Sequence, residues 1–149
     1  MPYGDLQEIL TLAIGWEKEL KDLYDVAAVA LRDQKSKKLV ALLRERLVKN
    51  LQVLEAVDVN KYGKATWVMY SSVFRTDDLI PKTKLKKDFT PKEILDHILE
   101  CEEKLRDFYT TTRDLLVSRE PEELFDSLVA FKTGQIIEIK NSLEGYEFT

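Results

Sequence analysis

Two glutamates recur at the same place in two similar nine-residue segments. The segment W-E-K-E-L-K-D-L-Y covers residues 16–24, and C-E-E-K-L-R-D-F-Y covers residues 101–109. Glu17 and Glu102 therefore stand 85 positions apart, and the tyrosines that end the segments have the same offset. Each glutamate falls where the helical pattern otherwise places apolar side chains, and a buried carboxylate without a partner is costly or takes up a proton. We therefore expect each glutamate to meet a metal, a cation from another helix or a water-filled cavity.

Four stretches with three- and four-residue apolar spacing predict the helices that carry these residues. The first begins at Asp5 with a capping-box spacing to Glu8, and the third begins with T-P-K-E at residues 90–93, another capping box. The second follows the turn-like segment 33–36, and the fourth begins near residues 120–121 and stops around Gly145. For the second helix we expect an inward stripe made of Leu39, Leu42, Leu43, Arg46, Val53 and Val57.

The segment between the second and third helices, about residues 58–89, is long for a connection inside a compact domain. If the helices pack as two related hairpins, this segment is the long crossover of an antiparallel four-helix bundle with ferritin-like topology. Within it, residues 65–74 are apolar enough to form a short helix or strand that covers the bundle, and the basic run 82–87 is interpreted as a solvated loop. The fold class predicted for residues 1–149 is a single all-α domain.

Composition limits the classes of function. The chain has 149 residues, 44% of them hydrophobic and 34% charged, which is typical of a soluble helical protein. Its net charge of -4 argues against nucleic acid as the main partner. The sole cysteine, Cys101, excludes an internal disulfide and a rubredoxin-type iron site. No nucleotide cofactor, signal peptide or membrane span is expected, so we predict a cytoplasmic protein.

The repeated Glu and Tyr, in two hairpins joined by a crossover, resemble the rubrerythrin-type branch of the ferritin-like superfamily, from about residue 5 to residue 146. In that family the first and third helices each supply one Glu, and the second and fourth each supply Glu-x-x-His, which together hold two iron or manganese ions. The resemblance implies that Glu17 and Glu102 are the two single-Glu ligands. It also implies oxidoreductase, peroxide-handling or iron-handling activity.

The second half of that ligand set is replaced in this sequence. No Glu-x-x-His occurs, and the only histidine, His97, lies on the third helix. By position, Lys132 and Gln135 stand at the corresponding places on the fourth helix. On the second helix the stripe points to Arg46 and Lys49, with Leu47 and Asn50 as the alternative shifted by one residue.

These replacements leave three hypotheses open. The first is the two-metal oxidoreductase that the resemblance implies. The second is a metal-free relative in which Glu17 and Glu102 pair with Lys132 and Arg46, two anions with two cations, and the bundle serves as a structural or interaction module. The third is a protein in which the glutamates hold one weakly bound metal with other ligands. A homodimer or a higher homo-oligomer is expected as the assembly.

The remaining reactive side chains near the repeat have structural interpretations. We expect Tyr24 and Tyr109 to be core aromatics whose hydroxyl groups bind polar partners. Cys101 is expected to be a partly buried, inert thiol, and His97 a histidine on the helix surface.

Overall fold

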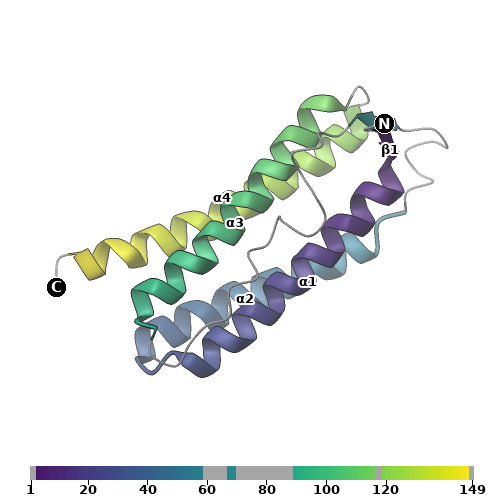
Figure 1. Ribbon diagram of the computed structural model, residues 1–149. Helices are drawn as coiled ribbons and strands as arrows, with labels where there is room; N and C mark the ends of the chain where they lie inside the picture. Colours follow the sequence, from purple (N-terminus) through teal and green to yellow (C-terminus); the bar gives the residue numbers. More distant parts are fainter. Residues whose placement is uncertain (1–2, 59–66, 70–88, 117–118, 148–149) are drawn as a thin grey trace.

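Four helices make up most of the part of the chain that the structure describes. The computed structural model describes residues 3–58, 67–69, 89–116 and 119–147. In these residues the helices are α1 (Leu6–Ala30), α2 (Gln34–Glu55), α3 (Pro91–Leu115) and α4 (Arg119–Glu147). The closest packing joins α1 with α2 and α3 with α4, and the two pairs pack on each other through α1 with α3 and α2 with α4 (Figure 1). The predicted helical fold class and four-helix bundle are confirmed.

A short strand pairing closes one end of the bundle. Strand β1 (Tyr3–Asp5) runs directly into α1 and pairs antiparallel with β2 (Trp67–Met69). The segment 65–74, expected to form a short helix or strand, thus contributes a three-residue strand. The rest of that segment and the basic run 82–87 lie outside the described residues. Within the described part of the chain, no helix is long and apolar enough to cross a membrane.

Side-chain caps fix where two of the helices begin. Asp33 precedes α2 and accepts a hydrogen bond from the backbone N–H of Ser36 at 2.9 Å. Thr90 caps α3: its hydroxyl accepts from the Glu93 N–H at 3.1 Å, and the Glu93 carboxylate accepts from the Thr90 N–H at 3.0 Å. The predicted capping box is therefore present, and it satisfies backbone donors that the first turn of a helix leaves unpaired.

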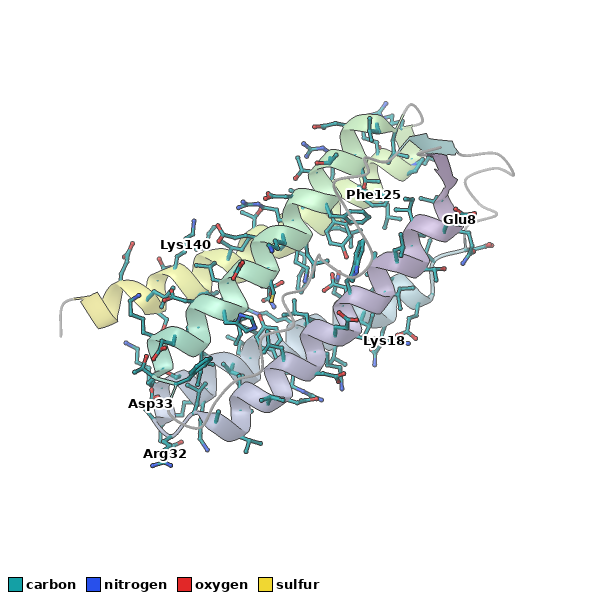
Figure 2. The ribbon with its side chains drawn as sticks, viewed as in Figure 1. Glu8, Lys18, Arg32, Asp33, Phe125 and Lys140 are labelled. Carbon is teal, nitrogen blue, oxygen red and sulfur yellow. The ribbon has the colours of Figure 1, made fainter. Side chains whose placement is uncertain are left out.

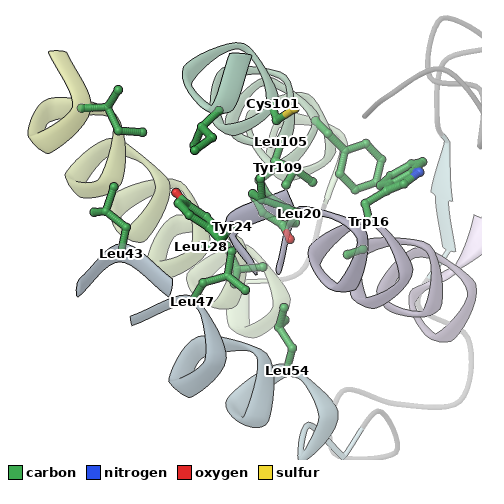
Figure 3. Packing of buried hydrophobic residues seen from close by; sticks show 14 of the residues in the cluster. Trp16, Leu20, Tyr24, Leu43, Leu47, Leu54, Cys101, Leu105, Tyr109 and Leu128 are labelled. Carbon is green, nitrogen blue, oxygen red and sulfur yellow. The ribbon is translucent and has the colours of Figure 1, made fainter. Parts of the chain in front are cut away.

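The core is built from one face of each helix. An edge-to-face pair, Trp16 on α1 and Phe108 on α3, lies 4.8 Å apart between ring centroids, and Tyr109 and Phe125 extend the aromatic cluster toward α4. Figure 3 shows Trp16, Tyr24 and Tyr109 among the leucines of this core. Phe125 lies inside the bundle, whereas Lys18 and Lys140 lie on its outside (Figure 2).

The inward face of α2 differs from the predicted stripe. Leu42 and Val53 are 39% and 60% exposed, so these two positions face outward. The buried residues of α2 are Ser36, Val40, Leu43, Leu47, Leu51 and Leu54. Because apolar residues of α2 occur on more than one face, their spacing alone did not determine which face packs on the bundle.

Candidate functional site

The two repeated glutamates meet a lysine in the middle of the bundle. Lys132 of α4 places its Nζ 2.6 Å from Glu17 Oε1 and 2.7 Å from Glu102 Oε1. Glu17 is 1% exposed, and Glu102 and Lys132 are fully buried. One ammonium group therefore bridges a carboxylate from α1 and a carboxylate from α3, as the metal-free hypothesis expected for Lys132.

Two tyrosines complete this arrangement, each from the opposite repeat. The Tyr109 hydroxyl of α3 donates to Glu17 Oε2 at 2.6 Å, and the Tyr24 hydroxyl of α1 donates to Glu102 Oε2 at 2.8 Å. Every carboxylate oxygen in the site thus accepts a hydrogen bond. We call these five side chains, Glu17, Tyr24, Glu102, Tyr109 and Lys132, the buried charge cluster.

Helix periodicity explains how the repeat builds the cluster. A glutamate and a tyrosine seven residues apart stand two turns apart on the same face of a helix. In the observed packing of α1 and α3, each glutamate accepts a hydrogen bond from the tyrosine of the other repeat. The expectation that Tyr24 and Tyr109 are core aromatics with bound hydroxyl groups is confirmed. That each tyrosine binds the glutamate of the other repeat was not predicted. The common offset of 85 residues indicated that both helices carry the same Glu and Tyr positions, but it does not determine which tyrosine each glutamate contacts.

The cluster holds two carboxyl groups and one amino group in the buried interior of the bundle. Burial is the largest influence on Glu17 and, with the neighbouring charge of Glu102, raises its pKa despite the attraction of Lys132. Burial alone would lower the pKa of Lys132, but the two carboxylates outweigh it and raise the pKa above its ordinary value. Lys132 is therefore an ammonium ion at neutral pH. If both acids are ionised the cluster carries one net negative charge, and one added proton makes it neutral.

Arg46 and Lys49 do not belong to this site, which corrects the expected pairing of Arg46 with a buried glutamate. The Arg46 side chain is 44% exposed and lies 3.8 Å from Glu138 on α4. Lys49 is 73% exposed and pairs with Glu45 of its own helix. The register of α2 turns both positions toward the surface, where charged heads keep their hydration. The prediction that two cations neutralise the two glutamates is therefore correct for Lys132 and wrong for Arg46.

The alternative shifted by one residue, with Leu47 and Asn50 in place of Arg46 and Lys49, agrees with the observed orientation of α2. Leu47 is 1% exposed and faces the core. The repeat offset of 85 residues relates Leu47 to Lys132 (132 − 85) and Asn50 to Gln135 (135 − 85). One half of the internal repeat therefore supplies the lysine, and the other half supplies a leucine at the equivalent position.

Gln135 has a structural contact next to the cluster. Its Nε2 donates to the backbone oxygen of Leu43 on α2 at 2.9 Å, and the side chain is 1% exposed. Its counterpart Asn50 has a buried Nδ2 with no hydrogen-bond partner among the described residues. Gln135 thus links α4 to α2, and its amide group is engaged with the backbone.

The side chains around Glu17 and Glu102 do not fit a two-metal centre. Such a centre needs carboxylate and imidazole ligands from all four helices. Here α4 contributes an ammonium group and an amide, and the corresponding position on α2 is Leu47. Within the described residues, no three His, Cys, Asp or Glu side chains group in a way that could hold a metal ion. The ammonium group of Lys132 lies between the two oxygens that a metal would share.

His97 and Cys101 lie on α3 outside the buried charge cluster. Cys101 is fully buried, and burial first, followed by the nearby acids, raises the pKa of its thiol to about 12. It is therefore an inert thiol at neutral pH, buried more completely than expected. His97, expected on the helix surface, is half-buried, and its Nε2 is buried with no hydrogen-bond partner among the described residues.

No protein-family model, curated protein or solved structure matches this chain. The proposals that follow are therefore built on the geometry of the buried charge cluster.

Removing either tyrosine hydroxyl group should destabilise the fold through one particular glutamate. Tyr109→Phe leaves Glu17 Oε2 buried without its donor, and Tyr24→Phe does the same to Glu102. We expect each to lower the free energy of unfolding by about 1–3 kcal/mol in urea denaturation. In double-mutant cycles, Tyr109→Phe should couple more strongly to Glu17→Gln than to Glu102→Gln. Equal coupling energies with Glu17→Gln and Glu102→Gln would contradict the observed hydrogen bond between Tyr109 and Glu17.

Proposed function

We propose that this protein is a metal-independent relative of the ferritin-like superfamily that serves as a structural or interaction module. The observation that carries the proposal is the position of Lys132 Nζ, 2.6 and 2.7 Å from carboxylate oxygens of Glu17 and Glu102. The ammonium group of Lys132 neutralises negative charge as a metal ion would. Because it belongs to the chain, it does not have to be bound from solution. The helices can therefore pack and keep these two acids buried without a cofactor.

The proposal includes an antiparallel bundle of ferritin-like topology. The links between α1 and α2 and between α3 and α4 are short, whereas residues 56–90 separate α2 from α3. The start of α3 lies at the same end of the bundle as the turn between α1 and α2 (Figure 1). The end of α2 and the start of α3 lie at opposite ends of the bundle (Figure 1), and a long crossover connection would join helices placed in this way.

The cluster is better suited to structure than to catalysis. Its five side chains are at most 1% exposed, so a substrate has no access to them without opening of the bundle. All four carboxylate oxygens are already hydrogen-bonded to Lys132, Tyr24 or Tyr109. For assembly, we propose a homodimer formed through a helix face. The exposed Val26 and Val29, one turn apart on α1, support this arrangement.

A second candidate function is the oxidoreductase that the family resemblance implies. The convergence of Glu17 from α1 and Glu102 from α3 on one point favours it, because two carboxylates in this relation suit a hard divalent cation. It requires Lys132 to leave the position between them. The two functions therefore differ in whether Lys132 or a metal neutralises the glutamates.

Metal content distinguishes these functions. Protein purified from cells grown with ample iron and manganese should contain far less than one metal per chain. It should also show no new visible absorption when ferrous iron is added in air, because Lys132 fills the site. The matched control is Glu17→Gln/Glu102→Gln, which should give the same metal content as the wild type. About two metals per wild-type chain, lost in the control, would support the oxidoreductase and overturn the proposal.

A further inference from the structure

We infer that the space between Glu17 and Glu102 is a binding site for a primary ammonium ion, and that Lys132 is its covalently tethered ligand. The inference rests on the proposed function, in which Lys132 replaces a metal. It goes further by naming the chemical class that the site recognises. If the tether is removed, a free alkylammonium ion of the same length should bind in its place.

The contacts of the ammonium group support this chemical class. Lys132 Nζ donates to an oxygen of each glutamate, and the ring of Phe131 has its centroid 5.3 Å from Nζ. A primary ammonium ion offers three donors and a compact charge, which suit two carboxylates and an aromatic face. Tyr109 and Tyr24 hold the outer carboxylate oxygens, so the inner oxygens are oriented without help from Lys132.

The stem of Lys132 defines the shape of the ligand. The residue is fully buried, and α4 also contributes Leu128 and Ile136 to the buried interior. In Lys132→Ala the missing atoms are three methylene groups and the nitrogen, which correspond to n-propylammonium. Engineered cavities in protein cores admit small molecules that match their size and polarity. Alkylamines of this type are protonated at neutral pH, as lysine is.

The test is rescue of thermal stability in Lys132→Ala at neutral pH in an amine-free buffer. Adding n-propylamine should raise the Tm of the variant in a saturable way, on the order of 5 °C, because a ligand that binds only the folded state stabilises it. The wild type should not respond, since its own lysine fills the site. A response of the variant that saturates, together with no response of the wild type, supports the inference.

Three controls separate charge recognition from cavity filling. The neutral 1-propanol has the length without the charge, and tetramethylammonium has the charge without N–H donors, so both should have little effect. Leu128→Ala opens a cavity one turn away on α4 with all charges retained, and n-propylamine should not stabilise it. Equal rescue by 1-propanol, or equal rescue of Leu128→Ala, would overturn the inference.

Two further outcomes are decisive. If Lys132→Ala does not fold, Glu17→Gln/Lys132→Ala is used, because it buries one acid fewer and keeps Glu102 as the anion. Failure of n-propylamine to shift the Tm of the folded variant would overturn the inference, as would a larger shift with manganese chloride. If n-propylamine fails to shift the Tm but the wild type contains no metal, the inference is wrong and the proposed function still stands. Metal bound by the wild type would instead defeat the proposed function itself.

Discussion

Replacing Lys132 with methionine should lower the free energy of unfolding by about 3–5 kcal/mol, the range measured when one partner of a buried ion pair is removed. Methionine has nearly the length of lysine, so most of the packing volume is kept. What is lost is the only positive charge that contacts Glu17 and Glu102 within the described residues. Both acids would then be buried without compensation, and they must take up protons or expose themselves to water.

Restoring the charge balance should restore part of the stability. Glu17→Gln/Lys132→Met removes one of the two uncompensated acids, and Glu17→Gln/Glu102→Gln/Lys132→Met removes both. We therefore expect urea midpoints to rise from the single to the double to the triple variant, with unchanged m-values. Identical midpoints for Lys132→Met and Glu17→Gln/Lys132→Met would show that the lysine does not act through Glu17.

The parts of the site that could be predicted from the sequence are those fixed by local periodicity. The two copies of the nine-residue segment placed Glu17 and Glu102 on the inner faces of their helices, and both are buried. On α4 the apolar spacing, together with the family resemblance, indicated Lys132 and Gln135, and both lie in the core. Around these positions apolar residues recur at three- and four-residue steps, and this spacing indicated the buried face.

The second cation could not be predicted, because it depended on the rotation of α2 about its own axis. Arg46 and Leu47 are neighbours in sequence and differ by about 100° around a helix, so the choice between them decides what faces the site. Packing against the other helices selected Leu47. The offset between the repeats, which relates residue 47 to residue 132, pointed to the same answer and is a better guide here than apolar spacing.

This rotation changes the electrostatics of the whole cluster. With Arg46 at the surface, one ammonium group faces two carboxylates, and the tyrosine hydroxyls supply hydrogen bonds but no charge. A buried net charge is costly, so the folded protein should hold a proton more tightly than the unfolded chain does. The pH dependence of stability is therefore the direct measure of the imbalance.

Glu17→Gln should gain stability relative to the wild type as the pH rises from about 4.5 toward neutrality. Burial, followed by the charge of Glu102, raises the pKa of Glu17 in the folded protein above its ordinary value of 4.5. A raised pKa of an acid gives stability that is fully present below 4.5 and is lost as the pH rises through the folded pKa. Glutamine cannot titrate, so the variant lacks this loss.

The difference between the two unfolding free energies should therefore grow with pH, by at most about 1.4 kcal/mol per pH unit for one proton. Denaturant titrations of both proteins between about pH 4 and pH 8 measure it, and groups elsewhere cancel in the difference. Titration of Lys132 does not affect this pH range. Its pKa is raised above the ordinary lysine value of 10.5, so its contribution to the free energy of unfolding stays constant below that pH. The control is Glu19→Gln, an exposed position on the same helix, whose curve should stay parallel to that of the wild type. A parallel curve for Glu17→Gln would mean that the cluster tolerates two ionised acids around a single lysine.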